Sequence, residues 1–242
     1  MTPSLLWRGM LAGLVGAFVA ATVALLFAEP SIDAAIAFEA ARSAHHMGGE
    51  EVELVSRATQ KTYGLYTAML VYGAALGGVF AILFAGMQGR VGRASPRGLA
   101  LLLGLAGFVA IGLVPALVYP PNPPAVGLHE TVRLRTAAYF AMLALSVAAA
   151  TLALWSYRRL AGRIAGLDRL LIAIGIYAAT VALVQRLLPV IDEVPARFPA
   201  TLLWQFRLAA IGTQALFWLV AADLFGRAAE RTVMDEQRRV AR

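Results

Sequence analysis

Six long apolar segments constrain the fold of this chain more than any other feature of its sequence. Their approximate limits are 5–28, 62–87, 98–119, 135–157, 167–188 and 203–226. At a rise of ~1.5 Å per helical residue, each is long enough to cross the ~30 Å hydrocarbon core of a bilayer. Backbone polar groups stay unpaired in lipid unless the segment is helical. The sequence therefore predicts an all-α polytopic membrane protein, with a single transmembrane domain over residues 1–242.

The composition agrees with a lipid-embedded chain. Hydrophobic residues make up 60% of it and charged residues only 14%, whereas soluble domains carry about a quarter charged residues. The net charge of +7 would favour nucleic acid in a soluble protein, but here the basic residues lie in short segments between the apolar runs. We therefore expect the lipid bilayer, and no nucleic acid, as a partner. The absence of cysteine excludes disulfides, thiolate ligands and thiol catalysis.

The distribution of Lys and Arg predicts the orientation. With the N-terminus inside, thirteen basic residues fall in inner segments and eight in outer segments or adjoining helix ends. This excess predicts both termini in the cytoplasm of a multi-pass membrane protein. The run 9–27 is 19 residues long, which exceeds a typical signal-peptide core, so we expect an uncleaved first span.

The outer loops carry the more distinctive sequences. In the first, 29–61, the stretch from Ile32 to Glu39 predicts a short helix along the membrane surface. The second has four prolines within 120–124, and the third, 188–199, also has several, so neither is expected to be helical. An arginine follows each loop: Arg57, Arg135 and Arg207. This weak repeat favours three helical hairpins of one orientation, although arginines snorkelling at the interface would give the same pattern.

Small residues recur three or four apart in the first two spans. Gly9, Gly13 and Gly16 lie in the first, and Gly73 and Gly77 in the second. Such spacing favours close helix packing. The alternative is that one of these faces lines a narrow permeation path.

Candidate metal ligands gather in the outer loops. Imidazole and carboxylate groups suit divalent Co, Ni, Cu and Zn ions. The predicted metal-contacting residues are His45, His46, Glu39, Asp33, His129, Asp192 and Glu193. For the carboxylates the alternative is a surface charge paired with Arg57, Arg135 or Arg207. Near the inner end of the last span, Asp223 is interpreted mainly as a partner of Arg227, with a relay role as the alternative.

Signatures of catalysis are missing from the sequence. It contains no His-Glu-x-x-His, no Gly-x-Ser-x-Gly and no phosphate-binding glycine loop. We therefore expect no enzyme and no prosthetic group.

Taken together, the motifs resemble the CbtA family, the proposed cobalt transporter subunit of bacteria. The resemblance rests on the following segments: Arg8-Gly9 with Leu11-Ala12-Gly13; Glu29-Pro30-x-Ile32-Asp33-x-Ala35-Ile36-x-x-Glu39; Ser56-Arg57-x-x-Gln60; Tyr119-Pro120-x-Asn122-Pro123-Pro124-Ala125-Val126-Gly127; Arg135-Thr136-x-x-Tyr139; and Leu188-Pro189-x-x-Asp192-Glu193-Val194-Pro195-x-x-Phe198-Pro199-Ala200-Thr201-Leu202-Leu203-Trp204.

The resemblance implies cobalt uptake connected with cobalamin synthesis. It also implies a small single-span partner, CbtB, with a histidine-containing tail. The leading hypothesis is therefore a subunit of a divalent cation uptake transporter, with Co2+ as the transported ion and a homo-oligomer as a possible assembly. The alternative is a non-transporting scaffold or accessory subunit of a membrane complex.

Overall fold

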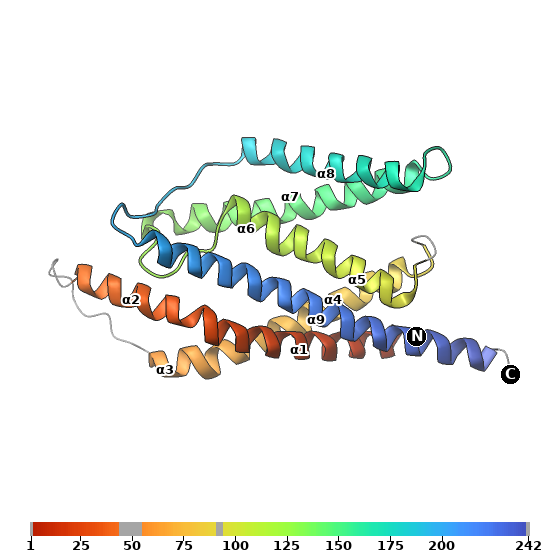
Figure 1. Cartoon of the computed structure of the whole chain (residues 1–242), viewed down its shortest axis with the longest axis horizontal. Coiled ribbons are helices and arrows are strands. Elements are labelled where there is room, and N and C mark those ends of the chain that lie inside the picture. The colour runs from red at the N-terminus through yellow and green to blue at the C-terminus, as the bar shows by residue number, and fades with distance from the viewer. Residues whose placement is uncertain (1, 44–54, 91–93, 241–242) are drawn as a thin grey trace. The chain divides into compact units, whose positions relative to one another are not determined.

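The structure is a computed structural model that describes residues 2–43, 55–90 and 94–240. It contains helices and no strand among these residues (Figure 1). In chain order the α-helices are α1 (Thr2–Phe27), α2 (Glu29–Ser43), α3 (Arg57–Thr59), α4 (Leu65–Met87), α5 (Pro96–Gly107), α6 (Val114–Val118), α7 (Val132–Arg159), α8 (Gly166–Leu187) and α9 (Ala200–Val240). The all-α prediction is confirmed.

Six helical stretches are long and apolar enough to cross a membrane. They are Ser4–Phe27, Arg57–Met87, Pro96–Val118, His129–Arg159, Gly166–Leu187 and Ala200–Thr232. This confirms the six predicted spans. The three-hairpin arrangement and the inward-facing termini stay predictions.

The helix boundaries differ from the expected ones where local capping or its absence decides them. The second span begins at Arg57, ahead of the expected residue 62, because the Ser56 hydroxyl caps the helix by accepting a hydrogen bond from the Thr59 amide at 3.4 Å. The last helix continues to Val240, past the expected residue 226. No proline or glycine follows Gly226 to end it.

Two spans contain a π-helical turn, at Gln60–Gly64 and Phe108–Leu113. The second lies just ahead of Pro115. A proline inside a helix has no N–H to donate and its ring displaces the preceding carbonyl, so a locally widened turn is the expected accommodation. The two proline-bearing loops are not helical at 119–124 and 188–199, as predicted.

The chain divides into two compact units. The first comprises Met1–Phe108, Pro123–Ala125 and Pro199–Arg242, and the second Val109–Asn122 and Val126–Phe198. A single transmembrane domain stays a prediction. In the second unit α7 packs against α8, and buried Ser146 shares a hydrogen bond of 2.8 Å with the Tyr177 hydroxyl.

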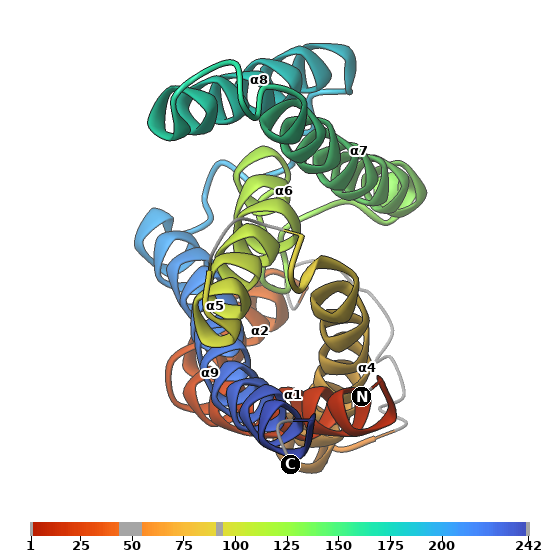
Figure 2. The same cartoon turned by 90° about the vertical axis from the view of Figure 1, so that its right-hand side faces the viewer.

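In the first unit α1 packs against both α4 and α9, and α5 packs against α9 (Figure 2). Aromatic rings fill part of this core: Phe225 meets Phe84 and Phe80 edge-on, with ring centroids 5.0 and 5.4 Å apart. The start of α1 lies beside the C-terminal half of α9, where the Arg8 guanidinium donates a hydrogen bond to the Ala228 carbonyl at 2.6 Å.

The helix predicted in the first outer loop exists as α2. It runs on from α1 after a turn at Ala28 and packs against α9 (Figure 1). Ala35 of α2 is fully buried. That it lies along a membrane surface stays a prediction.

Candidate functional site

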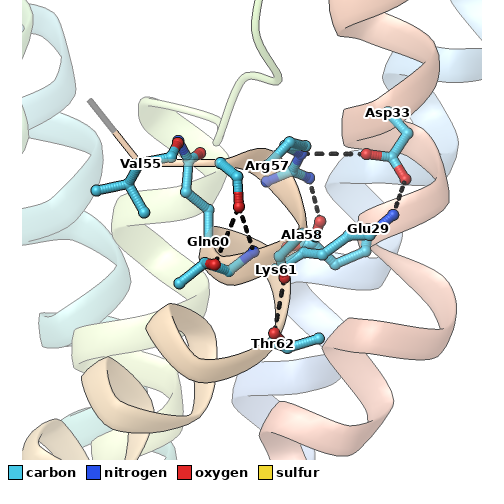
Figure 3. A network of polar contacts seen from close by, with 10 residues as sticks. Glu29, Asp33, Val55, Arg57, Ala58, Gln60, Lys61 and Thr62 are labelled. Atoms are coloured by element: carbon cyan, nitrogen blue, oxygen red, sulfur yellow. Dashed lines mark hydrogen bonds and ion pairs between the residues drawn. The ribbon is translucent and has the colours of Figure 1, made fainter. Parts of the chain in front are cut away.

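Four charged side chains join the start of α2 to the start of the second span (Figure 3). The Arg57 guanidinium pairs with Glu29 through Nη2, and with Asp33 through Nε at 3.1 Å. The Lys61 ammonium takes the other oxygen of Asp33 at 3.0 Å. We call these four residues, Glu29, Asp33, Arg57 and Lys61, the charge clasp. It holds two carboxylates and two cations.

The spacing along each helix produces the clasp. Glu29 and Asp33 are four residues apart and so lie on one face of α2. Arg57 and Lys61 are also four apart, at the capped start of their helix and in the first π turn. Two successive turns of one helix therefore face two successive turns of the other.

The two carboxylates of the charge clasp differ in exposure. Glu29 is buried, with 7% of its surface exposed, whereas the Asp33 side chain is 41% exposed. A buried carboxylate needs a partner to offset its desolvation, and Arg57 supplies it. The hydrogen bond from Lys61, and then the one from Arg57, hold the pKa of Asp33 below its usual value.

From the charge clasp toward the N-terminus of α1, the contact between α1 and α4 becomes less polar and then very close. Thr22 and Tyr66 share a hydrogen bond of 3.0 Å between their hydroxyls. Further along, Gly13 faces Gly73 and Gly77, and Gly9 faces Gly77, so closely that an added Cβ at any of these positions would collide with backbone of the other helix. We call this contact the glycine seam. It supports the packing interpretation of these small residues and leaves no permeation path between their backbones.

The second unit has its own link between the two proline-bearing loops. The Glu193 carboxylate accepts a hydrogen bond from the Leu128 amide at 2.9 Å and lies 3.5 Å from Nε of Arg135. Gly127, with φ of +117°, makes room for the Arg135 guanidinium, which an added Cβ would strike. Hydrogen bonds from Thr131 and then Leu128, with Arg135 adding a smaller effect, lower the pKa of Glu193.

The predicted metal ligands are therefore found in separate settings. Asp33 belongs to the charge clasp, and Glu39 is exposed further along α2. His129 and Asp192 are exposed in the second unit, close in sequence to the two partners Leu128 and Glu193. His45 and His46 lie outside the described residues. Among the residues that the structure describes, no group of three or more His, Asp or Glu side chains is placed to hold a metal ion.

The alternative of carboxylates paired with arginines accounts for Asp33 and Glu193 as the structure places them. The sequence analysis missed Lys61 and did not include Glu29 among the predicted metal ligands, although the matched spacing of the two pairs was a usable signal. Asp223 pairs with Arg227 at 2.8 Å, as predicted. It also pairs with Arg97 at 2.6 Å, a partner 126 residues away that no local pattern indicates.

Comparison with known proteins identifies a family but no individual relative. No curated protein and no solved structure matches the chain. A family model described as "Probable cobalt transporter subunit (CbtA)" matches residues 2–230, nearly the full length. This agrees with the six apolar helices of a multi-pass membrane protein. The chain belongs to the CbtA family of probable cobalt transporter subunits.

Proposed function

We propose that this chain takes up a divalent metal ion, with cobalt favoured, across the bacterial plasma membrane for cobalamin synthesis. Membership of a family of probable cobalt transporter subunits supports the ion and the transport role. The excess of basic residues in the inner segments supports cytoplasmic termini and therefore outer loops that face the incoming ion. A small single-span subunit of the CbtB type is the proposed partner.

The charge clasp is the observation on which this proposal depends. Its two carboxylates, on Glu29 and Asp33, pair with two side chains that each carry a single positive charge, Arg57 and Lys61. One divalent ion carries the same charge as the two cations that it would displace. Arg57 and Lys61 stay attached to the chain, so an ion that binds both carboxylates requires these two side chains to turn away toward water, where their charges are solvated.

Exposure gives the exchange a direction. Asp33 is the more exposed carboxylate, so an ion arriving from water meets it first, and buried Glu29 lies one helical turn deeper. Glu39, His45 and His46 follow on the same outer segment and are the proposed further ligands. In the second unit, His129, Asp192 and Glu193 are proposed to attract and hold the cation in the same way.

Uptake of radioactive cobalt tests the proposal. Cells expressing the chain with its candidate partner subunit are expected to accumulate cobalt above background, and the Asp33→Asn variant is expected to accumulate much less. Asp168→Asn is the matched control, because Asp168 is an exposed carboxylate at the start of α8, outside every proposed metal-binding group. Background uptake by the wild-type chain, both alone and with its partner, would discard the transport role.

One observation favours the scaffold alternative. The best-placed carboxylates of the described chain already pair with arginine or lysine, and such pairs can serve only to hold helices together. A scaffold predicts that alanine at His45, His46, Glu39 and Asp192 leaves metal accumulation unchanged while the partner subunit is still retained. The transport proposal predicts reduced accumulation with the partner still bound.

A further inference from the structure

A second ion-pair cluster lies at the opposite end of the first unit from the charge clasp. Asp223 of α9 accepts hydrogen bonds from two arginines. Arg97 at the start of α5 donates from Nε and Nη2 to Oδ1, at 2.9 and 2.6 Å. Arg227, one turn further along α9, donates from Nε to Oδ2 at 2.8 Å. We call Arg97 and Arg227 the arginine pair.

Packing fixes the position of the arginine pair. Gly226, next to Arg227, lies against the backbone of Arg97, where an added Cβ would come within 3.1 Å of the Arg97 Cα. The start of α5 is capped by the Ser95 hydroxyl, which accepts from the Gly98 amide at 3.1 Å. The backbones that carry the two arginines are thus fixed by the packing of α5 against α9.

The arginine pair carries more positive charge than its partner neutralises. Among the side chains that the structure describes, Asp223 is the only carboxylate paired with either arginine. Arg8, at the same end, binds the Ala228 carbonyl and the Thr232 hydroxyl at 2.6 and 2.5 Å and adds a third positive charge. The arginine side chains of the pair remain 40% and 54% exposed, so their other N–H groups can reach a further acceptor.

Both arginines stand at the ends of apolar segments, so we expect the arginine pair at the depth of lipid headgroups whichever way the protein is oriented. Arg97 is the second residue of the third span, and Arg227 follows the apolar core of α9 that ends near Phe225. At the start of the first span, Trp7 is 60% exposed beside Arg8. Exposed tryptophan next to arginine is typical of the interfacial belt of membrane proteins.

We propose that the arginine pair binds the phosphate of an anionic phospholipid. Guanidinium groups recognise phosphate oxygens with two parallel N–H donors. A phosphodiester carries one negative charge, which matches the one positive charge of the arginine pair that Asp223 leaves uncompensated. The acyl chains of such a lipid would lie along the apolar surface of the unit while its headgroup bridges α5 and α9. This site is separate from the proposed cation path at the charge clasp and does not depend on it.

Lipid retention by the purified full-length protein tests this site. Native mass spectrometry in detergent, with added phosphatidylglycerol or phosphatidylcholine, gives the affinity for each lipid. We expect wild-type protein to retain phosphatidylglycerol in preference to phosphatidylcholine, and Arg227→Gln to weaken phosphatidylglycerol binding about fivefold. Arg227→Gln leaves the Arg97–Asp223 bonds in place, so the fold is retained. Arg133→Gln on α7 removes the same charge from an exposed position and serves as the matched control.

Each outcome decides between the alternatives. Equal binding of phosphatidylglycerol by the wild type, Arg227→Gln and Arg133→Gln would overturn the proposal, as would equal affinity for both lipids. A thermal stabilisation by inorganic phosphate that equals the one by phosphatidylglycerol would identify a free-phosphate site and overturn the lipid assignment. Arg227→Lys sharpens the test, because it keeps the charge but loses the two-donor geometry and should recover only part of the affinity.

Discussion

The two ends of the first unit use similar residues for different purposes. At one end the charge clasp joins α2 to the second span with two carboxylates and two cations, and one of its carboxylates is buried. At the other end the arginine pair joins α5 to α9 through a single, partly exposed carboxylate. The ratio of charges separates the two ends: the charge clasp is neutral, whereas the arginine pair with Asp223 keeps one positive charge.

Burial explains why the two ends should respond differently to mutation. Removing one partner from a buried ion pair leaves a charge that is neither solvated nor compensated, which costs far more than losing an exposed pair. The Glu29 side chain is 9% exposed, whereas the Asp223 side chain is 26% exposed and pairs with two arginines. The comparison therefore predicts an asymmetry that can be measured.

The largest expected effect on stability comes from replacing one arginine at each end of the unit. Arg57→Gln should lower the free energy of unfolding by roughly 3 kcal/mol, because Glu29 is left buried without its partner. Arg227→Gln should lower it by less than about 1 kcal/mol, because Arg97 still pairs with Asp223. Denaturant unfolding of both proteins in the same detergent gives the two values. Equal losses would show that the clasp and the pair are energetically alike and would break the comparison.

A smaller effect is expected from the glycine seam that lies between the two ends. Gly77→Ala places a methyl group against the Gly9 carbonyl of α1 and should destabilise the protein by about 1–3 kcal/mol. Gly86→Ala, on the same helix, meets nothing within 4 Å and should be neutral or slightly stabilising. Thermal unfolding of the two variants makes this measurement. If Gly86→Ala were the more harmful change, close backbone contact would not be what joins α1 to α4.

The smallest expected effect is a pH dependence confined to the clasp. The pKa of Asp33 is lowered by Lys61 and Arg57, so its carboxylate contributes stability that is fully present above its ordinary pKa of 3.8. This contribution is lost as the pH falls through the lowered value. The stability difference between the wild type and Asp33→Asn should therefore be constant near neutral pH and shrink in acid. A difference that grows as the pH falls would mean that Asp33 is not held as a carboxylate.

The predicted site residues illustrate what local sequence can and cannot indicate. Asp33 and Glu193 were recognised as candidate ligands, and pairing with a nearby arginine was recognised as the alternative. The choice between these needs the distance between side chains on different helices, which no spacing within one helix supplies. Lys61 illustrates the same limit, because its only signal was its offset of four residues from Arg57.

From the sequence alone, six helices apolar enough to span a membrane and a resemblance to the CbtA family could be predicted, and both predictions are confirmed. Lipid allows few backbone solutions, so the length and apolarity of a segment nearly decide its structure, and the loop motifs carry the family resemblance. Which helices contact each other could not be predicted in this way and comes from the three-dimensional packing. The packing brings the backbones of Gly13 and Gly73 together. It also pairs Arg57 with Glu29 and Arg97 with Asp223. Such contacts depend on how the faces of separate helices fit together, which is a property of packing and not of any single segment.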